Sequence, residues 1–313
     1  METLFVSITI PCKKIDNLAI ECLKHCLSLD YKNFEILLLP DTKEKYKQSK
    51  KLRIIETGNV MPAVKRNVAM KKARGKIFAF LDSDAYPEKN WLKNAVRYLK
   101  EKDIAAVGGP QLTPKKANFI EHAAGHTLAN FFVAGKAAIR YKIAKNQFVN
   151  ELPSANLIVK KEYANKFIPG LLTAEDSKFC FDILKKGKKV LYAKDVIVYH
   201  HRRNTIKKHL DQMRIYGRDI ALLTKKEFSF SKLYYSLLSL FSLYIFLGLI
   251  FSFFYKGFKN FYLVTVLVYL IIMLLTSMKK NLKISLLVFM LSILTHFAYG
   301  IGYIQGLGGK TKK

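Results

Sequence analysis

Two carboxylates that follow an apolar run are the residues best suited to chemistry in this chain. Asp82 and Asp84 come directly after the five apolar residues 77–81, a run typical of a buried strand. Such a strand delivers both side chains to its carboxyl end, where the loops of an open α/β sheet hold ligands. Carboxylates are hard oxygen ligands for Mg²⁺ or Mn²⁺, and such an ion is usually shared with substrate phosphates. The opposing interpretation is a ligand-free turn, because Asp and Ser favour turns.

The elements that must position these carboxylates alternate between strands and helices. Apolar runs predict strands at 4–10, 34–39, 53–55, 77–81, 104–107, 190–192 and 196–199, and residues 152–159 predict a turn followed by a strand. Amphipathic stretches between them predict helices, one of which starts at Pro62 and closes at Gly75. Another is expected to open at Thr173, with Asp176 at capping-box spacing. This alternation predicts an α/β fold with a mostly parallel, doubly wound sheet.

The last third of the chain differs strongly from the rest. After residue 222 the charge-free runs 233–255, 261–278 and 284–304 are each close to the length needed to span a ~30 Å hydrocarbon core. We therefore expect a soluble-type domain at 1–222 and a membrane domain at 223–313 with two to three transmembrane helices. Lysines before the first run and between the last two fit a cytoplasmic side, whereas those at 310–313 do not fit three crossings. The third run is therefore either a span or a re-entrant or interfacial segment.

The composition restricts the partners. The sequence holds 53 Lys and Arg against 23 Asp and Glu, a formal net charge of +30, which attracts polyanions. No nucleic-acid-binding motif accompanies this charge, so we expect anionic lipid or nucleotide phosphates as partners and no nucleic acid. The four cysteines form no zinc set and are expected to be buried thiols in a reducing compartment. Without a signal-peptide pattern at the start, the first domain is expected to be cytoplasmic at a cell membrane.

Taken together, these motifs resemble the inverting glycosyltransferases of family 2, which have the GT-A fold, a Rossmann-like mixed sheet flanked by helices. The similarity covers roughly residues 4 to 220, and the tail resembles the C-terminal membrane anchors of prokaryotic members. The matching stretches are Ile8-Thr9-Ile10-Pro11, Asp41, Arg66-Asn67, Phe80-Leu81-Asp82-Ser83-Asp84, Leu152-Pro153-Ser154-Ala155-Asn156, Glu175-Asp176 and Val198-Tyr199-His200-His201. Several motifs in register are more specific than any one of them.

The resemblance implies transfer of a sugar, with inversion, from a nucleotide-diphosphate donor to a lipid-linked or glycan acceptor. It implies that Pro11, Asp41 and Arg66 line the nucleotide pocket. Asp84 would ligate the Mg²⁺ or Mn²⁺ that bridges the two phosphates, and Asp82 would contact the ribose or the hydration shell of the metal.

The same resemblance implies roles for later residues. His200 would add a metal ligand or a diphosphate contact. Asp176 would be the base that deprotonates the acceptor hydroxyl, with Glu175 supporting the loop or the acceptor. Further expected contacts are Gly108, Gly109 and Asn156 on the acceptor side, and Arg202, Arg203 and Arg214 at the diphosphate.

The chain departs from the family pattern in three places. Pro40-Asp41-Thr42 replaces paired Asp followed by Gly-Ser, and Cys12-Lys13-Lys14 replaces an aromatic residue with Asn. The Gln-x-x-Arg-Trp motif of processive synthases is absent, since the chain reads Gln212-Met213-Arg214-Ile215-Tyr216 there. This argues against a processive polysaccharide synthase. A catalytically silent scaffold of the same fold and a basic module that binds lipid or nucleic acid stay open as competing interpretations.

Overall fold

The computed structural model describes residues 4–170, 175–226 and 236–309. The chain divides into two compact units. The first, which we call the sheet unit, contains the described parts of Met1–Pro114, Ile139–Gly170 and Glu175–His201. The second, the helical unit, contains Lys115–Ala138 and the described part of Arg202–Lys313. The expected boundary between residues 222 and 223 stays a prediction.

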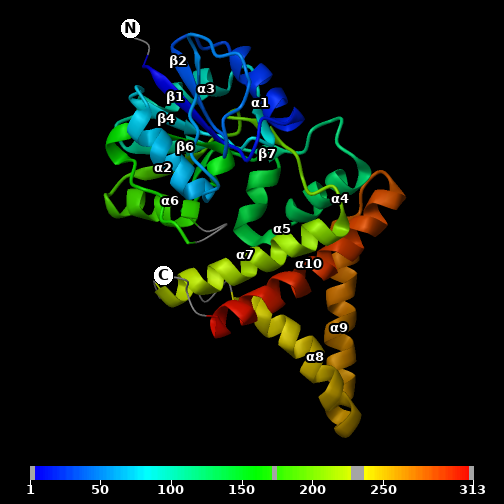
Figure 1. Cartoon of the computed structure of the whole chain (residues 1–313). Helices are drawn as coiled ribbons and strands as arrows, with labels where there is room; N and C mark the ends of the chain where they lie inside the picture. Colours follow the sequence, from blue (N-terminus) through cyan, green and yellow to red (C-terminus); the bar gives the residue numbers. More distant parts are fainter. Residues whose placement is uncertain (1–3, 171–174, 227–235, 310–313) are drawn as a thin grey trace. The chain divides into compact units, whose positions relative to one another are not determined.

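The larger sheet of the sheet unit is mixed and mostly parallel (Figure 1). Its order is β3-β2-β1-β4-β9-β6-β10-β8, with β9 antiparallel to both neighbours and β8 antiparallel at the edge. The bounds are β1 Val6–Pro11, β2 Phe34–Leu39, β3 Leu52–Ile54, β4 Ile77–Phe80, β6 Ile104–Gly108, β8 Gln147–Phe148, β9 Leu157–Lys160 and β10 Lys189–Tyr192. Strands β1, β2 and β4 are buried along their whole length, because helices cover both faces of the sheet. The predicted α/β class is confirmed.

Two hydrophobic cores lie on the two faces of this sheet. Helices α1 (Asn17–Leu27) and α3 (Trp91–Leu99) pack on one face through residues such as Leu23 and Trp91. Helices α2 (Pro62–Lys72) and α6 (Glu175–Lys185) pack on the other through Ala69 and Phe179. Doubly wound packing of this kind leaves the carboxyl ends of the parallel strands free to carry a site.

Some element ends differ from the sequence prediction. Helix α2 begins at Pro62 as predicted, but it ends at Lys72 rather than at Gly75. Gly75 instead packs against β1, where an added Cβ would lie 2.6 Å from the Ser7 backbone nitrogen. Thr173, the expected cap of α6, lies outside the described residues.

The sheet unit also contains a second sheet, of three strands. Strand β11 (Val198–His200) lies between β5 (Ala85–Pro87) and β7 (Gln111–Leu112). Its antiparallel register pairs His200 with Ala85, the residue after Asp84. The small sheet therefore brings two predicted site residues together across 116 residues of sequence.

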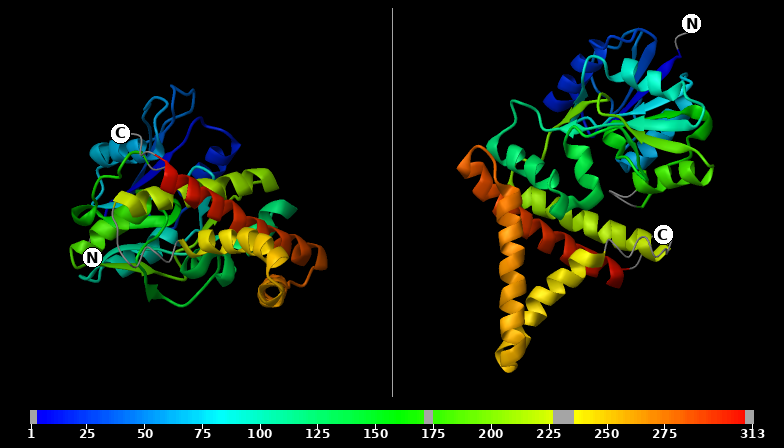
Figure 2. Two further views of the ribbon diagram at one scale, coloured as in Figure 1. Left: turned by 90° about the horizontal axis from the view of Figure 1, so that it is seen from below. Right: turned by 180° about the vertical axis from the view of Figure 1, so that it is seen from behind.

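The helical unit contains α4 (Phe119–Leu128), α5 (Phe131–Ala134), α7 (Ile206–Lys226), α8 (Leu237–Phe254), α9 (Lys256–Ser277) and α10 (Leu282–Gly308). Among the described residues, α8, α9 and α10 are long and apolar enough to cross a membrane. Part of the predicted first span, residues 233–235, lies outside the described part. Figure 2 shows α7 and α10 side by side, with α8 and α9 joined at their far ends.

Candidate active site

Asp82, Asp84 and His200 form one cluster at the carboxyl end of β4. Their nearest donor atoms all lie within 4.8 Å of one another, and the His200 Nε2 to Asp84 Oδ1 distance is 3.1 Å. All three side chains are half-buried, so solvent and a ligand can still reach them. Two carboxylates and an imidazole nitrogen suit Mg²⁺ or Mn²⁺. The group predicted from the sequence is thus brought together as a candidate site for a divalent cation.

Gln111 orients the His200 ring. His200 Nδ1 lies 3.2 Å from Gln111 Oε1, and a carboxamide oxygen can only accept a hydrogen bond. His200 Nε2 in turn lies 3.1 Å from Asp84 Oδ1. Both ring nitrogens therefore have a partner, and the ring is held with Nε2 facing the Asp84 carboxylate. Sequence reasoning missed Gln111, although it lies two positions after Gly109.

Arg66 connects this cluster to the carboxylates of α6. Its Nη2 donates to Asp82 Oδ1 at 2.7 Å, and its Nη1 donates to Glu175 Oε1 at 3.0 Å. The guanidinium is only 3% exposed and Glu175 only 6%, so each charge depends on its partners. The sequence predicted Arg66 near the nucleotide, and its contact with Glu175 was missed because 109 residues separate the two.

Glu175 and Asp176 form the first described turn of α6. Asp176 Oδ2 accepts from the Ser154 backbone nitrogen at 3.1 Å and its Oδ1 from the Ser177 backbone nitrogen at 2.9 Å. Burial raises the pKa of Asp176 to about 6, with Arg140 opposing and Glu151 reinforcing the shift. Burial and the adjacent Asp176 raise the pKa of Glu175 to about 8 against the opposing effect of Arg66. Raised carboxyl pKa values in a part-buried site are typical of acid–base residues.

Arg140 and Glu151 make an ion pair beside Asp176 that sequence reasoning missed. Their closest atoms are 2.5 Å apart, and both charges lie within electrostatic reach of Asp176. Arg140 lowers the pKa of Asp176 and Glu151 raises it. The ion pair therefore helps to set that pKa. Neither residue stands in a recognisable motif, so only the fold reveals them.

The predicted nucleotide side contains a buried lysine as well. Pro11 ends β1, and Asp41 follows β2 after Pro40. The carboxylate of Asp41 accepts a hydrogen bond from Lys65 Nζ, which also donates to the Cys12 carbonyl at 2.6 Å. Lys65 is 3% exposed, so it joins the ends of the first two strands. Sequence reasoning named its neighbour Arg66 and missed Lys65.

The predicted acceptor-side residues have structural contacts of their own. An added Cβ on Gly108 would lie 2.1 Å from the Asn156 carbonyl oxygen, and one on Gly109 would lie 2.3 Å from the Ala193 carbonyl oxygen. The buried Asn156 amide accepts from Trp91 Nε1 at 2.8 Å and donates to the Val196 carbonyl at 2.8 Å. These contacts explain each residue by packing, and the acceptor-side role stays a prediction.

The predicted diphosphate arginines belong to the helical unit. The Arg202 backbone nitrogen donates to Glu121 Oε1 at 3.2 Å, and Arg214 Nε donates to Gln305 Oε1 at 2.8 Å. Arg203 follows Arg202 in the segment before α7. The expected contact of these three residues with a diphosphate stays a prediction.

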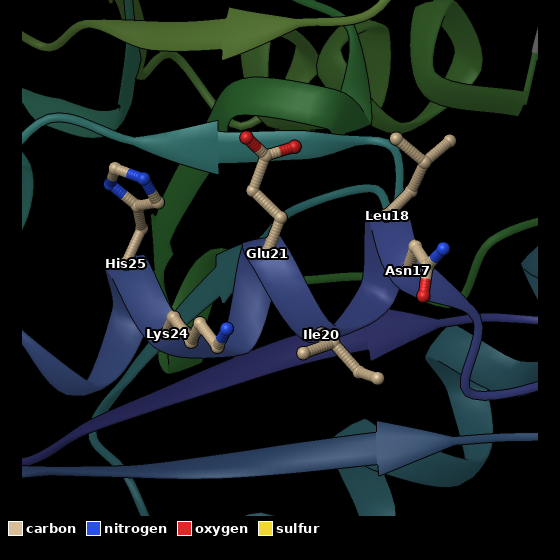
Figure 3. A pocket seen from close by; sticks show the side chains of 6 residues that line it. All are labelled: Asn17, Leu18, Ile20, Glu21, Lys24 and His25. Atoms are coloured by element: carbon tan, nitrogen blue, oxygen red, sulfur yellow. The ribbon is translucent and has the colours of Figure 1, made fainter.

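Two further features are not assigned to the site. A depression on α1 is lined by Asn17, Leu18, Ile20, Glu21, Lys24 and His25 (Figure 3). All six residues come from one helix and none is a predicted site residue, so we do not assign it to the site. The four cysteines are free and buried, as predicted, and burial raises the pKa of Cys180 to about 12, which disfavours a reactive thiolate.

Comparison with known families gives a match over the first half of the chain. Residues 7–158 match the model described as Glycosyl transferase family 2. This range includes the predicted nucleotide-side residues, the Asp82–Asp84 pair and Asn156. It ends before Glu175, Asp176 and His200.

Two curated relatives match over longer ranges. A Methanococcus voltae protein named "Dolichyl N-acetyl-alpha-D-glucosaminyl phosphate 3-beta-D-2,3-diacetamido-2,3-dideoxy-beta-D-glucuronosyltransferase" is 26% identical, with 97% of each chain covered. The glycosyltransferase GlyG of Streptococcus pneumoniae is 21% identical over 72% of this chain and 79% of its own. The first relative aligns along both the sheet unit and the helical unit.

A solved structure shares the fold. A mannosyltransferase from Pyrobaculum calidifontis, in complex with GDP-Man and Mn²⁺, superposes with a TM-score of 0.54 at 17% identity. The superposition covers 75% of this chain and 71% of the other. At 17% identity, the similarity shows only that the two proteins share a fold.

Proposed function

The chain belongs to glycosyltransferase family 2, and from this premise we propose that it transfers a sugar, with inversion, from a nucleotide-diphosphate donor to a lipid-linked acceptor at a membrane. One observation carries the proposal. Arg66 joins Asp82 of the candidate cation cluster to Glu175 of the α6 carboxylate pair through bonds of 2.7 and 3.0 Å. A donor-binding group and a candidate base region are therefore parts of one hydrogen-bonded arrangement.

We assign the general base to Asp176. In a single displacement, the acceptor oxygen forms a bond to the anomeric carbon while the bond from that carbon to the diphosphate oxygen breaks. The acceptor proton passes to the Asp176 carboxylate. With a pKa of about 6, this carboxyl is ionised at neutral pH and still basic enough to accept a proton. Glu175 is the weaker choice, because its pKa of about 8 leaves it mostly protonated at neutral pH.

Asp84 and His200 would hold the divalent cation, with Asp82 in a lesser role. Asp82 already shares Oδ1 with Arg66, whereas Asp84 and His200 Nε2 face each other. A divalent cation bound there would stabilise the charge on the leaving nucleoside diphosphate. The chain's own part is to orient these ligands through Gln111 and Arg66, and to hold the nucleotide beside Pro11 and Asp41.

The acceptor is proposed from the tail and from one relative. The three apolar helices favour a location at a membrane, where a lipid-linked acceptor is available. The name of the Methanococcus voltae relative also describes transfer to a dolichyl-linked sugar phosphate. We infer that the sheet unit faces the cytoplasm, since lysines before α8 and between α9 and α10 favour that orientation.

A donor panel tests this function. Membranes that contain the full chain are incubated with UDP-, GDP- and dTDP-sugars, Mg²⁺ or Mn²⁺, and a polyprenyl lipid extract. We expect nucleotide release from a subset of donors, dependent on lipid extract and on the divalent ion. Membranes that carry the Asp84→Asn variant serve as the control. If no donor releases nucleotide under any of these conditions, the chain is a silent scaffold and the proposal is wrong.

A further inference from the structure

Helix α7 carries a charged stripe that cannot lie in hydrocarbon. Its charged side chains recur along one face at intervals of three, four or seven residues. Lys207, Asp211, Arg214 and Lys225 are exposed and Arg218 is half-buried. Ionised groups inside a bilayer are costly and normally face a protein or aqueous interior. Most of these are exposed in the helical unit, so α7 lies outside the hydrocarbon core.

Helix α10 runs alongside α7 at backbone contact. A Cβ added to Gly302 would lie 2.0 Å from the Arg214 carbonyl oxygen, and one added to Gly306 would lie 2.4 Å from the Arg218 carbonyl oxygen. On the α7 side, a Cβ on Gly217 would lie 2.1 Å from the Tyr299 carbonyl oxygen. Small residues that let two backbones touch fix the distance between helices. Wherever α7 lies, the second half of α10 lies beside it.

Polar contacts extend this pairing along the second half of α10. His209 Nε2 lies 2.9 Å from Thr295 Oγ1, and Arg214 Nε donates to Gln305 Oε1 at 2.8 Å. Lys225 Nζ donates to the Leu307 carbonyl at 2.8 Å and so caps the C-terminal end of α10. The two helices are parallel, as Figure 1 also shows. Because these contacts extend from Thr295 to Leu307, α7 and α10 pack along their length and do not merely touch at one point.

The exposed large apolar residues of α10 lie on one face, in a group near each end of the helix, and we call them together the apolar stripe. They are Leu282, Leu286 and Met290 in the first half and Ile301, Ile304 and Leu307 in the second. Residues 291–300 between the two groups are buried or half-buried. Ser285, Ser292 and Thr295 are buried on the other side. A helix with one exposed apolar stripe and a protein-covered remainder is suited to lie along the membrane interface.

Helices α8 and α9 differ from α10 in this respect. Their exposed large apolar residues are numerous and lie on more than one side, as at Phe246, Leu247, Phe253, Leu263 and Val264. A chain reversal at Tyr255 joins them, and Figure 2 shows them as a hairpin. This is the surface expected of two segments that contact lipid around most of their circumference.

We propose that α8 and α9 are the two crossings of this chain and that α10 does not cross, lying with α7 along the membrane interface through its apolar stripe. The partner of this stripe is the headgroup and upper acyl region of the bilayer. The proposal rests on the membrane location in the proposed function. It also accounts for the lysines, because residues 279–283 and the lysines at 310–313 then lie on the same side as the lysines before α8.

Single introduced cysteines report on which side of the membrane each position lies. The three substitutions are Lys280→Cys just before α10, Gly308→Cys at the end of α10, and Gly257→Cys near the turn between α8 and α9. An added Cβ at Gly257 or Gly308 meets no atom within 4 Å, so both changes are sterically harmless. The full chain in sealed vesicles of known orientation is treated with a membrane-impermeant maleimide. The unmodified chain, with its four buried cysteines, gives the background.

We expect Lys280→Cys and Gly308→Cys to be labelled from one face of the vesicle and Gly257→Cys only from the other. Labelling of Gly308→Cys from the face opposite to Lys280→Cys means that α10 crosses, and it overturns the proposal while leaving the transferase intact. Labelling of all three from one face means that the hairpin does not cross, which overturns both this proposal and the membrane anchoring. Nucleotide release in the donor panel is read independently of these outcomes.

A depth measurement separates an interfacial α10 from a re-entrant one. Nitroxide labels are attached at Met290→Cys in α10 and at Leu267→Cys in the middle of α9, both exposed apolar positions. We expect the Met290 label to be reached by a water-soluble relaxation agent and the Leu267 label only by oxygen. Equal, deep burial of the two labels would contradict the proposal.

Discussion

At the scale of single residues, the site depends on how burial sets the pKa of Asp176. Burial raises this pKa to about 6, and a general base must be deprotonated to act. We therefore predict that kcat/KM falls as the pH drops through about 6. The Glu151 carboxylate reinforces the raised pKa and Arg140 opposes it. Glu151→Gln should therefore move the inflection to lower pH. An inflection that moves upward would contradict this assignment.

Arg66 is the residue whose loss should most affect the folded state. Arg66→Ala leaves Glu175, which is 6% exposed, without its cation. Removing one partner of a buried ion pair destabilises by about 3–5 kcal/mol. The lower end applies because Asp82 is 31% exposed and because the raised pKa of Glu175 lets that carboxyl take up a proton. Thermal unfolding of the full chain in detergent measures this effect. Arg66→Lys is the control, since it keeps the charge but cannot donate from two nitrogens to both carboxylates. Unchanged unfolding in Arg66→Ala would show that the bridge contributes nothing.

Gln111 should control metal affinity through the His200 ring. Loss of an outer-shell partner typically weakens metal binding about 10–100-fold. We predict that Gln111→Leu raises the Mn²⁺ concentration for half-maximal transfer by about that factor. Gln111→Glu keeps an acceptor for His200 Nδ1 and should retain most of the affinity. If Gln111→Leu responds to Mn²⁺ as the unmodified chain does, His200 is not a ligand.

At the scale of elements, glycines set the contact between α7 and α10. Gly302→Ala puts a methyl group 2.0 Å from the Arg214 carbonyl oxygen, so the helices must separate. Overpacking of this kind costs about 1–3 kcal/mol, more than the ~1 kcal/mol that alanine gains over glycine in a helix. The matched control is Gly308→Ala, whose Cβ meets nothing within 4 Å. We predict a lower unfolding midpoint for Gly302→Ala alone, and equal midpoints would contradict the close contact.

The elements were predictable where their signal is local. Strand β4 followed by Asp82 and Asp84 is visible in the sequence because an apolar run ends in two carboxylates. Non-local contacts carry no such signal. Arg66 contacts Glu175, which lies 109 residues further along the chain. Strand β9 lies antiparallel between β4 and β6, and its position depends on the assembled sheet and not on its own sequence. The ambiguity of the third apolar run is of the same kind, because hydropathy does not report that α10 packs on a charged helix.

At the scale of the whole molecule, the two units differ in charge and hydropathy and are suited to different tasks. The sheet unit holds the carboxylates that suit a nucleotide sugar and a cation, and the helical unit holds the apolar helices. The net charge of +30 fits a chain whose donor and lipid surroundings are both anionic. A basic module with no catalytic role would have no need of a buried arginine between Asp82 and Glu175.

The most direct test of the central claim measures donor binding and sugar transfer side by side in Asp176→Asn. The full chain in membranes is used, and Asp182→Asn on the same helix is the matched control. We predict that Asp176→Asn retains donor binding and loses about 10²–10⁴-fold in transfer rate, the usual contribution of a general base, while Asp182→Asn stays active. Transfer by Asp176→Asn at the rate of the unmodified chain would contradict the account.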